Sequence, residues 1–497
     1  MKNYSELKSG TDIRGFASDI YNNKINLTDE AIYDISSAFV VFLSNKSEIN
    51  ASDLVISVGH DSRITANRIK NVVIDALVNS GVTVIDCGLS STPAMFMTTV
   101  LDNCNGAIQI TASHHPADRN GLKFFMSSGG LDSKDITEII NFANNDTKIK
   151  NNDGKVIKKD FMKVYSAHLR TKICEELGVK ESDKPLKNFK IVVDAGNGAG
   201  GFYAKDILEK LGADTTGSVY LEPDGYFPNH IPNPEDATAM KSICNAVLNS
   251  KADLGLIFDT DVDRAACVGS DGCEINRNSL IALASTIVLE NNPNATIVTD
   301  SVTSDGLKEF IENKLGGKHH RFKRGYKNVI NEAIRLCDNG INAPLAIETS
   351  GHAALKENYF LDDGAYLVTK IIITMIKQQK NNKSISDLIA DLKIPVETKE
   401  LRFNILEKDF KLYGEKVIND LFKYCESDDS FKIAPDNHEG IRVNTEYGWF
   451  LLRLSVHDPN MPLNIESDIV GGTDKIIGMI TPFFEKYDGL NTDCLKK

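Results

Sequence analysis

The amino-acid sequence predicts an α/β protein with three similar α/β domains followed by a smaller α+β domain. Three observations favour this fold class. The chain has 497 residues, which is longer than a chain folded around a single hydrophobic core usually is. A strand–loop–helix pattern recurs three times along the first 400 or so residues. The last hundred or so residues have a different pattern.

The recurring pattern is a β-branched apolar run that ends in an aspartate, followed by small or polar residues and then a helix-like segment. The three runs end at Asp61, Asp194 and Asp300. Buried strands of α/β layers have this composition. The aspartates lie 133 and 106 residues apart, which favours three domains of one design over a short-period solenoid. A chance similarity of strand–loop–helix units is the alternative.

The C-terminal region begins after a polar stretch at 378–383, a short helical segment and Pro395. Strand-like runs follow at 440–443 and 449–454, and we expect the single tryptophan, Trp449, to pack in a core. These features predict a small α+β domain. The predicted domain boundaries are 1–165, 166–280, 281–393 and 394–497.

Composition and charge exclude some classes of protein. Hydrophobic residues make up 41% of the chain and charged residues 25%, as in ordinary globular proteins. The formal net charge of −13 disfavours nucleic-acid binding, which depends on lysine and arginine neutralising phosphates. Phosphorylated small molecules stay possible partners, because a few cations in a cleft can dominate the local field.

The cysteines and apolar runs predict a cytoplasmic protein without membrane association. The nine cysteines are spread singly, without a Cys-x-x-Cys pair, and their number is odd. The first residues contain no apolar signal region. The most apolar runs, such as 38–43 and 371–375, are far too short to span a bilayer.

An acidic loop is the strongest local signal for chemistry. Asp259, Asp261 and Asp263 follow a strand-like apolar run at alternate positions. Such hard oxygen ligands suit Mg²⁺ or Ca²⁺. An EF-hand is excluded, because Arg264 and Ser270 stand where it needs glycine and glutamate. The alternative is a solvated acidic turn, although Arg264 is well suited to hold a phosphate beside a metal.

Two further loops carry candidate site residues. Ser113 ends a strand-like run and could be a nucleophile or a phosphate carrier, but no Gly-x-Ser-x-Gly surrounds it, so a hydrolase elbow is not supported. Glu348 and Ser350, two residues apart, could bind adjacent sugar hydroxyls. His352 could exchange a proton near neutral pH, or serve only as a structural hydrogen-bonding group. Lys123, taken alone, is typical of a solvated lysine.

Four segments together resemble a known family, the α-D-phosphohexomutases, and specifically its bacterial phosphomannomutase/phosphoglucomutase branch. These segments are 9–15, the Ser113 loop, 259–264 and 348–352, in the family's order and approximate spacing. The resemblance runs from about Gly10 into the C-terminal domain. It implies four domains around a central cleft and an enzyme that interconverts hexose 1-phosphate and hexose 6-phosphate through a phosphoserine and hexose 1,6-bisphosphate.

The resemblance also assigns roles to residues of this sequence. The serine and the carboxylates that would carry the phosphoryl group and hold Mg²⁺ are Ser113, Asp259, Asp261 and Asp263. The groups that would surround the reacting phosphate and move protons are Arg14, Lys123, Arg264 and His352. Glu348 and Ser350 would bind sugar hydroxyls. The four domains would then carry the phosphoserine loop, the metal-binding loop, the sugar-binding loop and a phosphate-binding loop, in chain order.

The sequence departs from the family pattern in two loops. His115 stands where many relatives have asparagine. The C-terminal phosphate loop of the family reads Arg-Pro-Ser-Gly-Thr-Glu-Pro, whereas residues 453–459 lack the Gly-Thr pair, which lets backbone and hydroxyl donors approach a phosphate. We still expect phosphate binding by Arg453 and Ser455, with His457 as a further candidate.

Three alternatives stay open at this point. A metal-dependent phosphatase could use an aspartate of the acidic loop as its nucleophile, but Ser113 would then have no role. A sugar-phosphate-binding regulatory protein could keep the scaffold without turnover. Among mutases, a phosphoglucosamine mutase is the alternative to an enzyme acting on mannose and/or glucose. No motif identifies a residue that would contact the substituent at C2 of the sugar.

Overall fold

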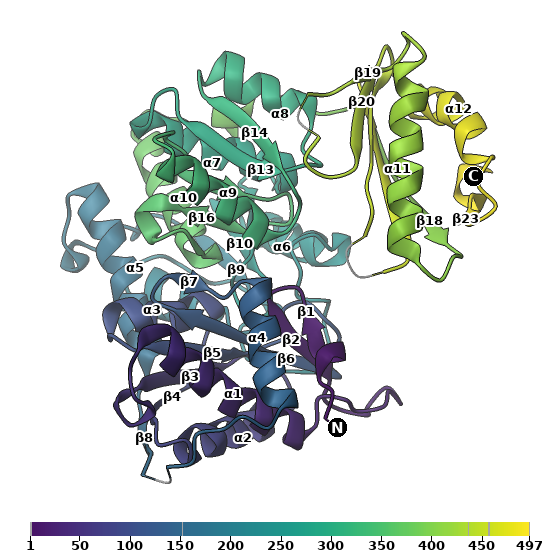
Figure 1. Cartoon of the computed structure of the whole chain (residues 1–497). Helices are drawn as coiled ribbons and strands as arrows, with labels where there is room; N and C mark the ends of the chain where they lie inside the picture. Colours follow the sequence, from purple (N-terminus) through teal and green to yellow (C-terminus); the bar gives the residue numbers. More distant parts are fainter. Residues whose placement is uncertain (1, 152, 436, 456–457, 497) are drawn as a thin grey trace. The chain divides into compact units, whose positions relative to one another are not determined.

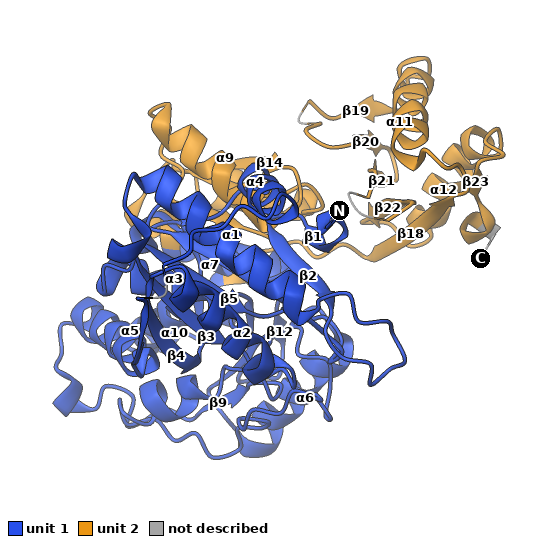
Figure 2. Cartoon of the chain, turned by 60° about the horizontal axis from the view of Figure 1, so that its bottom comes forward, with its two compact units in different colours: residues 1–287, 350–388 blue, residues 288–349, 389–497 orange. Residues whose placement is uncertain are grey.

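The computed structural model describes residues 2–151, 153–435, 437–455 and 458–496 (Figure 1). The chain divides into two compact units, coloured separately in Figure 2. Unit 1 consists of residues 1–287 and 350–388, and unit 2 of residues 288–349 and 389–497. Within the described residues, no helix is long and apolar enough to cross a membrane.

The first α/β layer of unit 1 is built on a mixed sheet in the order β1-β2-β6-β5-β3-β4-β8, with β7 paired to β6. Its strands are β1 (Lys8–Ser9), β2 (Asp12–Phe16), β3 (Val55–His60), β4 (Thr83–Leu89), β5 (Gly106–Ile110), β6 (Arg119–Met126), β7 (Gly129–Gly130) and β8 (Lys155–Lys158). Its helices are α1 (Asp29–Ser47), α2 (Ala66–Asn79), α3 (Thr92–Leu101), α4 (Ser133–Asn144) and α5 (Phe161–Leu177). Strands β3, β4, β5 and β8 pair in parallel, whereas β2 and β6 run antiparallel to their neighbours.

The alternation of side chains along β3 explains why helices cover both faces of this sheet. Ile56 and Val58 are fully buried in the core that α1, α2 and α4 share. Ser57 points the other way, where its hydroxyl lies 2.5 Å from the hydroxyl of Thr98 on α3. A strand buried on both faces reads as a continuous apolar run, which is the pattern seen in the sequence.

The second layer of unit 1 is a four-stranded sheet in the order β12-β11-β10-β9. Its strands are β9 (Ile191–Asp194), β10 (Leu254–Phe258), β11 (Ala265–Gly269) and β12 (Glu274–Ile275), and helix α6 (Ala237–Ser250) packs on it. Strand β10 runs parallel to β9 and antiparallel to β11. Phe258 pairs with Ala265, so the six residues between them form a closed hairpin loop that carries the acidic cluster.

The remaining elements of unit 1 are α7 (Arg277–Asn291), which begins in it, and a hairpin with a helix. The hairpin strands are β16 (Ala353–Leu355) and β17 (Leu361–Asp362), and the helix is α10 (Gly364–Gln379). The Asp363 side chain accepts a hydrogen bond from the Tyr366 backbone and caps α10.

Unit 2 contains a parallel α/β layer and an antiparallel α+β domain. The parallel layer has β13 (Thr296–Asp300) between β14 (Lys318–Phe322) and β15 (Leu345–Ile347), with α8 (Asp305–Glu309) and α9 (Tyr326–Asp338). The antiparallel sheet has the order β19-β20-β21-β22-β18-β23. Its strands are β18 (Glu397–Ile405), β19 (Lys432–Ile433), β20 (Ile441–Thr445), β21 (Gly448–Leu452), β22 (Asn460–Ser467) and β23 (Leu490–Asn491), packed against α11 (Phe410–Glu426) and α12 (Gly472–Phe484).

The predicted fold class, three α/β layers and a smaller α+β C-terminal domain, is confirmed. Trp449 is 3% exposed, as expected of a core residue, and the Arg442 guanidinium lies 3.5 Å from its ring centroid. The helix expected after Asp194 is a short π-helix, Tyr203–Leu208, which follows a glycine-rich segment. A second π-helix is Phe310–Lys314, and short 3₁₀ helices are Ser5–Leu7, Ala51–Asp53, Glu181–Asp183, Lys356–Asn358, Ser386–Ile389 and Asp493–Lys496.

Candidate active site

Ser113 lies in the loop between β5 and β6 and is fully buried. Its φ of 50° places it in the left-handed region, which a non-glycine residue adopts only where the surroundings enforce it. The Ser113 hydroxyl donates a hydrogen bond to Asp259 Oδ2 at 3.0 Å, and His114 Nδ1 lies 3.4 Å from it. The loop therefore aims the candidate phosphate carrier at the acidic cluster.

The three aspartates of the acidic loop form a buried cluster whose ligand oxygens lie within 4.8 Å of one another. Lys123 Nζ, on β6, contacts two of them, with Asp261 Oδ2 at 3.1 Å and Asp263 Oδ2 closer. Asp261 Oδ1 and Asp263 Oδ1 are buried and have no hydrogen-bond partner among the described residues. Oxygens of this kind are free to coordinate, so the donor set fits a hard divalent cation.

Burial and mutual repulsion control the protonation of the cluster. Burial, together with the negative charges of Asp263 and Asp261, raises the pKa of Asp259 well above its usual range. Burial alone would also raise the pKa of Asp263, but the positive charges of Lys123 and Arg264 and the hydrogen bond from Lys123 hold it below its usual value. Carboxylates that repel one another in this way bind a cation favourably.

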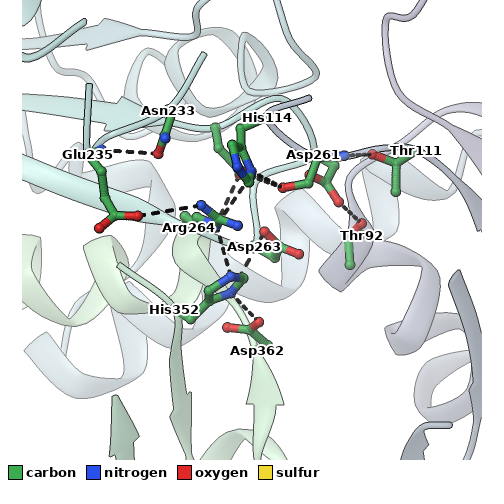
Figure 3. A network of polar contacts seen from close by, with 12 residues as sticks. Thr92, Thr111, His114, Asn233, Glu235, Asp261, Asp263, Arg264, His352 and Asp362 are labelled. Atoms are coloured by element: carbon green, nitrogen blue, oxygen red, sulfur yellow. Dashed lines mark hydrogen bonds and ion pairs between the residues drawn. The ribbon is translucent and has the colours of Figure 1, made fainter. Parts of the chain in front are cut away.

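Arg264 and His352 lie beside the cluster and fix each other's orientation. Figure 3 shows Arg264 between Glu235 and His352. Arg264 Nε donates to His352 Nε2 at 2.8 Å and lies 3.9 Å from Asp259 Oδ2. Since a guanidinium can only donate, His352 Nε2 accepts and Nδ1 carries the proton, which it donates to Asp362 Oδ2 at 2.5 Å. The imidazole is thereby held in one tautomer.

His114 and His115 stack next to Ser113, with ring centroids 5.1 Å apart. Burial, with the positive charges of Arg264 and Arg14 among its neighbours, lowers the pKa of His114 to about 2. Burial likewise lowers the pKa of His115 to about 3, again with a contribution from Arg14. Both rings are therefore neutral at neutral pH, so they add polar atoms but no charge next to the serine.

Arg14 lies on β2, where it is paired with Gly121 of the strand that carries Lys123. Its guanidinium donates to Asp12 at 2.8 Å. The structure thus brings the predicted residues Ser113, Asp259, Asp261, Asp263, Lys123, Arg264, Arg14 and His352 into one unit, and their charges act on shared neighbours. Ser350, also in unit 1, is 6% exposed.

The predicted substrate residues Glu348, Arg453 and Ser455 belong to unit 2. Glu348 Oε1 accepts a hydrogen bond from the Gly325 backbone at 2.5 Å. Arg453 follows β21, and burial lowers the pKa of its guanidinium while Glu439 opposes the shift. Its Nε is buried without a hydrogen-bond partner among the described residues.

Two hydrogen bonds hold Ser455 in the altered C-terminal loop. The Ser455 hydroxyl accepts a hydrogen bond from the Asp458 backbone at 3.2 Å, and the Ser455 backbone donates to the Asn460 carbonyl at 3.0 Å. Val456 and His457, the latter a candidate phosphate ligand, lie outside the described residues. The Ser455 side chain therefore accepts a backbone hydrogen bond within the described part of this loop.

Sequence reasoning missed several residues that complete this site. The Thr92 hydroxyl donates to Asp261 Oδ2 at 2.5 Å, although 169 positions separate the two residues. Asp362 orients His352, and Glu235 lies 4.0 Å from Arg264. Of these, only Asp362, an acidic residue at a strand end, carries a local signal that could have been read.

Comparisons with known protein families match most of the chain. Three family models match consecutively, described as phosphoglucomutase/phosphomannomutase, alpha/beta/alpha domain I over residues 8–160, domain II over 163–272 and domain III over 276–394. Three domain types of one family in chain order agree with the three α/β layers.

Curated relatives align over nearly their whole length. A phosphoglucomutase/phosphomannomutase of Thermococcus kodakarensis is 31% identical over 451 residues, covering 90% of this chain and 91% of the relative. A phosphoglucomutase of Neisseria gonorrhoeae is 29% identical, covering 94% of each chain. A phosphomannomutase/phosphoglucomutase of Pseudomonas aeruginosa is 29% identical, covering 92% of this chain and 90% of the relative.

Solved structures share the fold. A phosphoglucomutase/phosphomannomutase family protein of Burkholderia thailandensis has a TM-score of 0.78 at 23% identity and covers 98% of each chain. The phosphoglucomutase pp63/parafusin of Paramecium has a TM-score of 0.74 at 18% identity, covering 98% of this chain and 97% of its own. At these identities the likeness concerns the fold alone.

Proposed function

Since the chain belongs to the phosphoglucomutase/phosphomannomutase family of α-D-phosphohexomutases, we propose that it interconverts hexose 1-phosphate and hexose 6-phosphate of mannose and/or glucose through a phosphorylated Ser113. The enzyme class, a phosphohexomutase among the isomerases, follows from the family. The choice of sugar, the phosphoserine and the bisphosphate intermediate are our proposal. The cytoplasmic location expected from the sequence stays a prediction.

One observation carries the proposal: the buried Ser113 hydroxyl is hydrogen-bonded to Asp259, within a cluster of carboxylates and cations. A serine alone is a weak nucleophile, and a phosphoserine needs its charge neutralised before its phosphoryl group can leave. Lys123 and Arg264 are the cations that the fold places beside the carboxylates. Such an arrangement supports phosphoryl transfer by positioning and charge neutralisation.

In the first half-reaction the bond between Ser113 Oγ and phosphorus breaks while a sugar hydroxyl oxygen bonds to phosphorus. The hydroxyl proton leaves the sugar and ends on Ser113 Oγ, and the product is hexose 1,6-bisphosphate. After the bisphosphate turns end for end, its other phosphoryl group bonds to Ser113 Oγ, and the serine proton passes to the sugar oxygen. His352, with one tautomer fixed by Arg264 and Asp362, is our candidate for relaying these protons.

Asp259, Asp261 and Asp263 would hold Mg²⁺ together with a phosphoserine oxygen, and the two unpartnered buried oxygens support this assignment. When bound, the ion neutralises charge on the phosphoryl oxygens. Arg14 and Lys123 would bind the reacting phosphate.

Substrate recognition would involve all the remaining predicted residues. Glu348 and Ser350 would bind sugar hydroxyls, and Arg453 with Ser455 would hold the non-reacting phosphate. The corresponding domains would be 1–165, 166–280, 281–393 and 394–497.

A coupled assay tests the proposed function. Purified protein with Mg²⁺ and a trace of glucose 1,6-bisphosphate should convert glucose 1-phosphate or mannose 1-phosphate to the 6-phosphate. Ser113→Ala should lose this activity, whereas Ser128→Ala, at an exposed turn, should keep it. Release of inorganic phosphate would identify a phosphatase instead. If neither the 6-phosphate nor inorganic phosphate forms, the chain is a binding protein without turnover. A preference for glucosamine 1-phosphate would identify a phosphoglucosamine mutase.

A further inference from the structure

Arg63 is a fully buried arginine in the loop between β3 and α2. Its side chain has no exposed surface. Burying a guanidinium is costly unless its donors find acceptors, so the contacts of this side chain show what it holds.

The Arg63 guanidinium donates to four backbone carbonyls, three in the Ser113 loop and one at the first residue of β6. Nη2 donates to the carbonyls of Ser113 and His115, at 2.5 and 2.6 Å. Nη1 donates to the carbonyls of Pro116 and Arg119, at 2.7 and 2.9 Å. A planar fork of donors can meet four carbonyls at once, whereas a lysine ammonium offers three donors from a single atom.

The backbone N–H of Ser113 is held by residues that are themselves linked to Arg63. The Ser113 backbone N–H donates to the Thr111 hydroxyl at 2.9 Å, and that hydroxyl donates to Asp61 Oδ2 at 2.7 Å. Asp61 Oδ2 also lies 3.3 Å from Arg63 Nε. Both peptide groups of Ser113 are therefore fixed, which accounts for its left-handed φ of 50°.

A second loop covers the guanidinium. The Phe227 ring centroid lies 5.3 Å from the Arg63 Cζ atom. A Cβ atom at Gly225 would lie 2.4 Å from the backbone nitrogen of Ile64, so this loop packs directly on the backbone next to Arg63. Water is thus kept from the four hydrogen bonds, which then cannot be exchanged easily for solvent.

We propose that Arg63 is the positioning residue that fixes Ser113 in the conformation in which its hydroxyl meets Asp259. The arginine does not touch the reacting atoms, so it acts through the loop. This inference rests on the proposed function, because the position of Ser113 matters to turnover when Ser113 carries the phosphoryl group.

The test compares Arg63→Lys with the matched control Arg68→Lys, both as full-length protein. Arg68, in α2, has a side chain that is 38% exposed and bonds to Asp29 and to the Ala17 carbonyl, away from the Ser113 loop. Measurements of kcat and KM are made well below each melting temperature, alongside hydrogen exchange of backbone amides in residues 111–119.

Arg63→Lys should lower kcat about tenfold to a hundredfold, as expected for a reacting group displaced by about 1 Å, and leave KM within about twofold. Exchange of the loop amides should accelerate, while Arg68→Lys should match the wild type in both respects. If folded Arg63→Lys keeps the wild-type kcat, Arg63 serves stability only and the inference is overturned.

Should Arg63→Lys not fold, Thr111→Val tests the same frame, by which we mean the contacts of Arg63, Thr111 and Asp61 that hold Ser113. This substitution changes the side-chain volume very little. It removes the hydroxyl that accepts a hydrogen bond from the Ser113 backbone N–H. A reduced kcat at an unchanged melting temperature supports the frame, and a wild-type kcat contradicts it. A wild-type protein without mutase activity would refute the proposed function instead, and the exchange data would still decide whether Arg63 holds the loop.

Discussion

The ammonium of Lys123 lies between Asp261 and Asp263, and its side chain is 5% exposed. Lys123→Met removes this charge and keeps most of the aliphatic stem on β6. The substitution leaves two buried carboxylates without the cation that contacts both. We expect the variant to fold with lower stability and to have almost no mutase activity.

The size of the destabilisation follows from the burial of the pair. Removing one partner of a buried ion pair costs about 3–5 kcal/mol. For a domain of about 150–250 residues, 1 kcal/mol shifts the melting temperature by about 2–4 °C. The apparent melting temperature of Lys123→Met should therefore fall by roughly 6–20 °C in metal-free buffer.

Magnesium should recover part of this loss, because the same carboxylates are proposed to bind it. An ion present at a hundredfold excess over its Kd stabilises the folded state by about 2.7 kcal/mol. In the wild type Lys123 already neutralises part of the charge of these carboxylates, so the ion gains less there. Thermal melting with and without Mg²⁺ should therefore give a larger increase for Lys123→Met than for the wild type.

Lys70→Met is the matched control. Lys70 lies 3.3 Å from Asp86 in a partly buried pair in the same sheet layer, outside the acidic cluster. Its melting temperature should not respond to Mg²⁺ more than that of the wild type. If Mg²⁺ stabilises neither the wild type nor Lys123→Met, the acidic cluster does not hold the ion and the metal assignment is refuted.

Three further predictions concern other residues. Arg453→Ala should lower kcat/KM about tenfold to a hundredfold with the 1-phosphate and the 6-phosphate alike, since losing a hydrogen bond to a charged group costs about 1.5–3 kcal/mol; unchanged kinetics would make Arg453 a structural residue. Asp261→Asn should cut turnover and weaken Mg²⁺ binding in calorimetry, and equal activity with and without chelator would contradict this. Burial alone would lower the pKa of His230, but its bond to Asp194 raises the pKa above its ordinary value of 6.5. The stabilisation from this pair is therefore complete below about pH 6.5 and is lost as pH rises through the raised pKa of His230. The melting temperatures of wild type and His230→Gln should therefore converge at alkaline pH. A difference in melting temperature that stays constant with pH would exclude the charged pair.

The fold could be predicted because its strands carry their own local signal. Each apolar run that ends in Asp61, Asp194 or Asp300 is a buried strand. The aspartates themselves are structural: Asp61 accepts from the Arg63 backbone, Asp194 from Gly196 and Asp300 from Thr349. Short polar side chains that accept backbone or hydroxyl hydrogen bonds at strand ends explain why the same residue type recurs there.

The site was only partly predictable, because contacts between distant residues leave no local pattern. The acidic loop could be recognised because its three carboxylates stand at alternate positions of one short hairpin loop. Thr92 could not, because it reaches Asp261 across 169 positions. Arg63 lies among the polar residues that follow the first strand, and nothing local to that segment indicates that it binds a loop 50 residues further along the chain.

Peptide mass spectrometry after brief incubation with glucose 1,6-bisphosphate shows whether Ser113 carries the phosphoryl group. The peptide that contains Ser113 should gain ~80 Da, the mass of one phosphoryl group, and should lose it again when excess hexose 1-phosphate is added. Ser113→Ala should show neither change. Full turnover by a protein whose Ser113 stays unmodified throughout would contradict the account.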